Sequence, residues 1–90
     1  MRIVWDDAKR LTDIRNHRYD FDRVNDFDWD LAVVRAAKDG PRGEKRFMAV
    51  GPFESTFVAI VFSLLGSEAI SVISMRPASR SERRRYAREQ

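Results

Sequence analysis

The spacing of the apolar residues changes at Leu31, and this change sets the fold class open to the chain. Before Leu31 they recur every three or four positions, which is the spacing of a helix with one buried side. From Leu31 they form short runs rich in β-branched and aromatic residues, a pattern typical of strands. The runs predict four strands, at residues 31–36, 45–50, 56–62 and 69–75.

The segments between these runs are short, and each contains a glycine. They read KDGPRG, GPFES and LLGSE, which is too short for a crossover helix and predicts hairpins. The run 56–62 (TFVAIVF) is apolar on both faces, as expected of a central strand with helices on one side. The sequence therefore predicts an antiparallel meander.

Two helices are predicted before the sheet. After a short extended start, Asp6 or Asp7 supplies an N-cap for a helix over residues 8–17. The apolar stripe of this helix consists of Ala8, Leu11 and Ile14. Asp20 caps a second, shorter helix, and the residues on its apolar side are Phe21, Val24 and Phe27.

A third helix is predicted at the C-terminal end. Pro77 ends the last strand, and Ser79 and Glu82 have the spacing of a capping box. Only Tyr86 and Ala87 could pack, so we expect this basic helix to be held loosely or against a partner. The class is α+β, with two N-terminal helices on a four-stranded, mainly antiparallel sheet, and residues 1–90 form a single domain.

Positive charge is concentrated in the last helix. The chain has 17 Lys and Arg against 14 Asp and Glu, and residues 79–90 contain five of the basic and two of the acidic residues. This helix is either a solvated surface or a contact surface for nucleic acid or an acidic partner. The chain has no cysteine, no signal-like segment and no apolar run of membrane-spanning length, so we expect a cytoplasmic protein.

Several kinds of active site are disfavoured by residue content. His17 is the only histidine, no set of residues has the spacing of metal ligands, and no glycine-rich nucleotide motif occurs. We therefore expect no metal and no cofactor. His17 stands near a helix end beside Asp13, where it either forms a local hydrogen bond or acts directly in chemistry.

Cleavage of RNA is a reaction that such a small basic domain could perform without a metal ion. The ribose 2′-OH is an internal nucleophile, so the protein must move two protons and neutralise the charge that grows on the phosphate. Arginine suits the last task because its planar fork binds phosphate at two points.

Ordered motifs along nearly the whole chain resemble the BrnT toxin family. They are W-D-x-x-K (Trp5, Asp6, Lys9) with His17 and Phe21, then G-E-x-R (Gly43, Glu44, Arg46) with Gly51, I-S-M-R-x-A (residues 73–78), and Glu82-Arg83 with Tyr86. The resemblance implies a RelE-like ribonuclease toxin of a type II toxin–antitoxin system that arrests translation. A BrnA-like antitoxin would neutralise it and carry the contact with operator DNA, because this chain has no helix-turn-helix signature. A homodimer or a heterotetramer with that antitoxin is the expected assembly.

With this resemblance, candidate site residues can be named. The catalytic candidates are Lys9, Arg46 and Arg76 as phosphate-binding cations, and Glu44 and His17 as proton carriers. The candidates for RNA contact are Arg80, Arg83, Arg84, Tyr86 and Trp5. Glu44 could instead pair with a neighbouring cation, and the aromatic rings could instead pack in the core.

At six positions the chain departs from the residues more usual in that family. These are Asp13 (usually Asn), Asn16 (Lys), Arg18 (Gly), Leu65 (Arg), and Ser71 and Pro77 (often basic). The missing cations motivate an alternative, a toxin-like module that has lost catalysis and only binds protein or nucleic acid. A free-standing RNA-binding domain is less favoured, because the chain has neither an RRM aromatic motif nor a KH loop.

Overall fold

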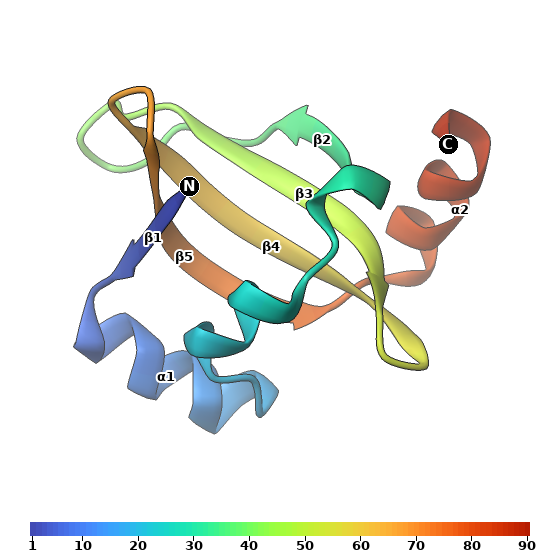
Figure 1. Ribbon diagram of the computed structural model, residues 1–90, viewed down its shortest axis with the longest axis horizontal. Coiled ribbons are helices and arrows are strands. Elements are labelled where there is room, and N and C mark those ends of the chain that lie inside the picture. The colour runs from blue at the N-terminus through green and yellow to red at the C-terminus, as the bar shows by residue number, and fades with distance from the viewer.

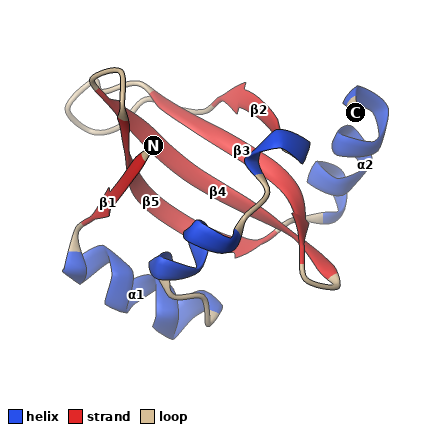
Figure 2. Ribbon diagram, in the orientation of Figure 1, coloured by secondary structure: helices blue, strands red, loops and turns tan.

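The computed structural model describes residues 1–90 and has an α+β architecture built on a five-stranded sheet (Figures 1 and 2). The strands are β1 (Arg2–Trp5), β2 (Val33–Ala36), β3 (Arg46–Phe53), β4 (Thr56–Leu65) and β5 (Ala69–Pro77). The helices are α1 (Asp7–His17), α2 (Arg80–Glu89) and two short 3₁₀ helices, η1 (Phe21–Asp26) and η2 (Trp29–Leu31). No helix is long and apolar enough to cross a membrane.

The predicted meander is confirmed, and the predicted strand count is wrong. The strand order is β1-β5-β4-β3-β2, with β2 to β5 antiparallel and β4 in the centre. The fifth strand is β1, which pairs in parallel with β5 from Arg2↔Ala69 to Trp5↔Val72. The four residues of β1 are too few for their sequence pattern to predict a partner strand, and β5 lies more than 60 residues away along the chain.

The second helix has the predicted position and a different geometry. Its N-cap is Asp20, whose carboxylate accepts from the backbone N–H of Asp22, and the helix is a 3₁₀ helix rather than an α-helix. Phe21, Val24 and Phe27 are all buried, as predicted. Phe21 and Val24 are one 3₁₀ turn apart and so lie on the same side of η1, and Phe27 follows as the C-cap residue just after the helix.

The apolar stripe predicted for α1 is wrong. Asp6 caps the helix as expected, with Oδ1 accepting from the N–H of Ala8 at 2.7 Å. However, Leu11 is 55% exposed, Ala8 is exposed, and the buried side chain of α1 is Asp13. The helix lies along the edge of β5, where its buried side meets backbone polar groups as well as apolar side chains.

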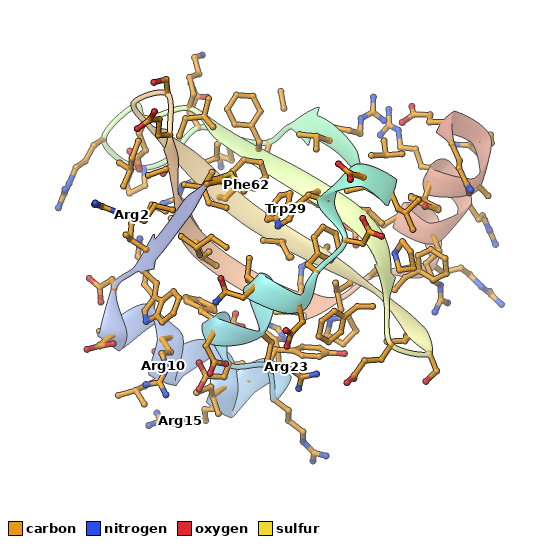
Figure 3. All side chains as sticks on the ribbon, in the orientation of Figure 1. Arg2, Arg10, Arg15, Arg23, Trp29 and Phe62 are labelled. Atoms are coloured by element: carbon orange, nitrogen blue, oxygen red, sulfur yellow. The ribbon has the colours of Figure 1, made fainter.

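The two faces of the sheet carry separate apolar clusters. The inner face packs against the 3₁₀ helices, and its largest fully buried side chains are Phe21, Val24, Val58, Ile60, Val72 and Met75. At its margin the ring of Trp29 meets Phe62 edge-on, with centroids 5.4 Å apart (Figure 3). The outer face packs against α2 through Tyr86, Val50, Ala59 and Ala78. The predicted capping box and the packing of Tyr86 are confirmed, and Ala87 is exposed.

Arg18 ends α1 in a strained conformation. It has φ +66° and ψ +15°, and its N–H donates to the carbonyl oxygen of Ile14 at 2.8 Å. A side chain in this left-handed region costs roughly 1–2 kcal/mol, whereas glycine adopts it freely.

We predict that Arg18→Gly raises the free energy of unfolding by about 0.5–1 kcal/mol, because relief of strain exceeds the added entropy of an unfolded glycine. Urea denaturation measures the change. The control is Arg15→Gly, inside the same helix, which should lower stability by about 1 kcal/mol. A loss of stability in Arg18→Gly would contradict the prediction.

Candidate functional site

Two adjoining cavities form a basic hollow where α1, the turn before β3, and the strands β4 and β5 meet. They have volumes of about 770 Å³ and 340 Å³, and Lys9, Arg46 and Ile73 line both. The charged residues of the larger cavity are Asp6, Lys9, Arg42, Glu44, Lys45 and Arg46. With Asp13 from the smaller cavity, the whole hollow has four cations and three carboxylates, a small positive balance that suits an anionic ligand.

A β-bulge in β5 places one wall of the hollow. Val61 pairs with Ser74 and the next residue, Phe62, pairs with Val72, so Ile73 is the extra residue. Bulges bend a strand and are frequent beside functional sites. Here the extra residue lines both cavities, next to Ser71 and the nearly buried Ser63.

Arg46 has unused hydrogen-bond donors inside the hollow. It begins β3 opposite Ser63, and its side chain is 20% exposed. Nε is buried without a partner, and the nearest carboxylate oxygen is Oε1 of Glu44, 3.4 Å from Nη2. A buried donor without a partner costs about 1–3 kcal/mol, so an anion bound here would meet donors that the protein leaves unsatisfied.

Glu44 is fixed by the turn that precedes β3. Oε2 accepts from the backbone N–H of Arg42 at 3.1 Å. The hydrogen bond from its own backbone N–H is the largest cause that holds the pKa of Glu44 below its usual value, and the charges of Arg46 and Arg42 add to it. A Cβ atom on Gly40 would lie 1.7 Å from Oε1, so the carboxylate fills space that only glycine leaves free.

Lys9 reaches the hollow from the first turn of α1. It is exposed and forms no ion pair with another side chain. Asp13 and Asn16 follow on the same helix face and line the smaller cavity with it. The structure thus brings together three predicted site residues, Lys9, Glu44 and Arg46, from segments that are far apart in sequence.

Two predicted residues lie outside the hollow. His17 is eight residues after Lys9 in α1, which places it about 12 Å further along the helix axis. Arg76 lies on the outer face, where Nη1 and Nη2 donate to the two carboxylate oxygens of Glu82 at 2.7 and 2.8 Å. This contact raises the pKa of Arg76 and lowers the pKa of Glu82 to about 2.

The remaining predicted residues divide by exposure. Arg80, Arg83 and Arg84 lie on the exposed side of α2 without ion pairs. Tyr86 is 5% exposed and donates its hydroxyl to the carbonyl oxygen of Leu31 at 2.8 Å, so it cannot stack on a base unless α2 moves. Trp5 is half-buried and packs edge-on against Phe21, with centroids 6.5 Å apart.

Sequence reasoning did not name Arg42 and Lys45 as site residues, although both line the hollow. One signal was available, because four cations fall within residues 38–46 around a glycine turn. Asp13 was named as a neighbour of His17 and as a departure from the family pattern, and not as a site residue. Its carboxylate accepts from Ser74 Oγ at 3.1 Å and from the N–H of Met75 at 3.2 Å.

Comparisons with family models and with solved structures give matches, whereas a comparison with curated sequences does not. The family model described as "Ribonuclease toxin, BrnT, of type II toxin-antitoxin system" matches residues 5–82. The crystal structure of the Brucella abortus ribonuclease toxin, BrnT, superposes with a TM-score of 0.71 at 40% sequence identity. That match covers 89% of this chain and 99% of the Brucella chain. A comparison with curated protein sequences gives no match.

We predict that Asp13→Asn preserves or raises stability at pH 7, whereas Asp13→Ala lowers it by about 1–3 kcal/mol. An asparagine can still accept from Met75 N–H and can donate to Ser74 Oγ, and it carries no buried charge. Burial raises the pKa of Asp13 in the folded protein. Wild-type stability should therefore fall, relative to Asp13→Asn, as pH rises from just below 4 through that raised pKa.

Urea denaturation between pH 3.5 and 7 tests this dependence. A difference between wild type and Asp13→Asn that does not change over this range would contradict it.

Proposed function

The chain belongs to the BrnT family of ribonuclease toxins of type II toxin–antitoxin systems, and on this premise we propose that it is an endoribonuclease acting at the basic hollow without a metal ion. The observation that carries the proposal is the side chain of Arg46, which is 20% exposed, lines the hollow with Glu44 and Lys9, and has an Nε without a hydrogen-bond partner. A scissile phosphate bound there would receive the free donors of Arg46.

The proposed reaction uses the ribose 2′-OH as the nucleophile. Glu44, whose pKa is held below its usual value by hydrogen bonds and by the neighbouring arginines, takes the 2′-OH proton as the 2′-oxygen bonds to phosphorus. Arg46 and Lys9 neutralise the charge that grows on the phosphate. The bond from phosphorus to the 5′-oxygen then breaks, and the Lys9 ammonium protonates that oxygen. The products are a 2′,3′-cyclic phosphate and a 5′-hydroxyl end.

Other residues predicted from the sequence bind the same RNA strand away from the scissile bond. We assign Arg76 and His17 to a flanking phosphate, because they lie outside the hollow on β5 and α1, the two elements that also supply part of its wall. The exposed arginines of α2, Arg80, Arg83 and Arg84, extend this path. Trp5 and Tyr86 are assigned to packing, because both rings are held by neighbouring side chains.

The partner expected for such a toxin is a BrnA-like antitoxin, which would also carry the contact with operator DNA. Two exposed apolar residues, Leu64 and Leu65, lie on the wall of the hollow and are 57% and 47% exposed. A protein covering them would also block RNA. We place the toxin in the cytoplasm, where it would arrest translation, with a RelE-like fold and a heterotetramer with its antitoxin or a homodimer as the assembly.

A specific observation favours a second candidate, a module that has lost catalysis and only binds protein or nucleic acid. Leu65 and Ser71 line the larger cavity, and Asn16 lines the smaller one. All three stand where the family more usually has a basic residue. Loss of positive charge is thus concentrated in the hollow itself.

We predict that Arg46→Ala lowers kcat for cleavage of a single-stranded RNA oligonucleotide by about 10²-fold, the effect of removing one preorganised donor to the transition state. Glu44→Gln should have a comparable effect. The matched control is Arg15→Ala, an exposed arginine of α1 outside the hollow, which should leave kcat unchanged.

EDTA should leave wild-type cleavage unchanged, and EDTA-sensitive cleavage would refute the metal-free mechanism. A wild-type chain that neither cuts RNA nor slows growth when expressed without its antitoxin would establish the second candidate.

For Arg76 we predict a different kinetic signature. Because it binds a flanking phosphate equally in the ground state and the transition state, Arg76→Ala should raise KM about tenfold and leave kcat within about twofold. Steady-state kinetics on the same oligonucleotide separate the two parameters. A large loss of kcat with KM unchanged would mean that Arg76 contacts the scissile phosphate instead.

A further inference from the structure

We infer that Glu82 is a positioning residue for Arg76, which it holds so that the Nε–Nη2 edge of the guanidinium stays open to an RNA phosphate. The inference rests on the proposed function, because it assigns a role within the RNA site. It concerns a residue for which the sequence indicates a helix cap and membership of a motif, but no contact with Arg76.

The contacts divide the donors of Arg76 into engaged and open ones. Nη1 donates to Glu82 Oε1 at 2.7 Å and to the carbonyl oxygen of Pro77 at 3.2 Å. Nη2 donates to Glu82 Oε2 at 2.8 Å, and its other contact is the sulfur of Met48 at 3.8 Å, a weak acceptor. Nε takes part in none of these contacts. One edge of the fork is therefore held by the protein, and the other can bind an anion at two points.

The carboxylate of Glu82 is itself immobile. Its side chain is 16% exposed, and Oε1 also accepts from the backbone N–H of Ser79 at 2.8 Å. The backbone N–H of Glu82 donates to Ser79 Oγ at 3.2 Å, which completes the capping box. Two donors of Arg76 and one of the helix N-terminus thus converge on one carboxylate. Its position is fixed by α2, and α2 in turn is fixed to the end of β5.

This arrangement lowers the conformational entropy that Arg76 would lose on binding RNA. An arginine side chain has many rotamers, and that conformational entropy is lost when a ligand immobilises the side chain. Arg76 loses that freedom on folding, through Glu82, so RNA binds a fork that is already oriented. The opposite reading is that Glu82 competes with RNA for Arg76. The two readings predict opposite signs for one substitution.

Glu82→Asp is the deciding variant, because it keeps the charge and withdraws the carboxylate by one methylene. If Glu82 positions Arg76, Glu82→Asp raises the Kd for a 2′-O-methyl RNA strand, which cannot be cleaved, by about fivefold to tenfold. KM for the cleavable strand rises in parallel, and kcat stays within about twofold. In an Arg76→Ala background, Glu82→Asp has no further effect. Arg76→Lys, which keeps the charge without the fork, behaves like Glu82→Asp.

Phe57→Leu is the matched control for a merely structural role. It removes the ring contact between Phe57 of β4 and Tyr86 of α2, whose centroids are 5.1 Å apart, and should lower stability by weakening the docking of α2. It changes no contact of Glu82 or Arg76, so Kd and KM should stay at the wild-type values once measured on folded protein. If Phe57→Leu raises Kd as much as Glu82→Asp does, the effect belongs to the docking of α2 and the inference fails.

Two other results would also overturn it. A lower Kd in Glu82→Asp would mean that the carboxylate competes with RNA. If Glu82→Asp raises Kd equally in the wild-type and the Arg76→Ala backgrounds, Glu82 does not act through Arg76. Because Kd is measured on a strand that cannot be cut, an inactive wild type would refute the ribonuclease proposal and leave this comparison intact.

Discussion

The edge of β5 is the constraint on which the rest of the structure depends. An edge strand presents unpaired backbone groups, and this one is covered by two different elements in succession. β1 covers it as far as Val72 through parallel pairing, and beyond that point Asp13 of α1 accepts the N–H of Met75. Strand β1 and helix α1 are joined through Trp5 and Asp6, so the first element fixes the second. The position of α1 in turn places Lys9, in its first turn, at the hollow.

The sequence was sufficient for those features that are local. The N-caps at Asp6, Asp20 and Ser79, the hairpins and the central position of β4 all follow from patterns spanning a few residues, and the structure agrees. Features that depend on distant partners were not predictable. No local signal in residues 2–5 indicates a partner at residues 69–72. The buried face of α1 was predicted wrongly. Apolar spacing identifies the side of a helix that covers a sheet face, but α1 covers the edge of β5, where the carboxylate of Asp13 is buried against a backbone N–H.

The candidate site also has features that the sequence could predict and features that it could not. Lys9, Glu44 and Arg46 were named from motifs and do share a cavity, since each motif stands at the end of an element that meets the others. Arg76 was named as well, but a sequence cannot show that its guanidinium is already bound by Glu82, six residues later. The same glutamate was correctly identified as a capping residue. Glu82 thus both caps α2 and binds Arg76, and only the capping has a sequence signature.

The wide separation of the wall residues along the chain has a consequence for synthesis. The hollow takes Lys9 from the start of the chain and Ile73 from near its end, and the parallel pairing of β1 must wait for β5. At 5–20 residues per second, several seconds of translation pass between these two positions. During that interval the nascent chain has no hollow. Under the proposed function, the nascent chain therefore has no assembled RNA site until β5 has been made and has paired.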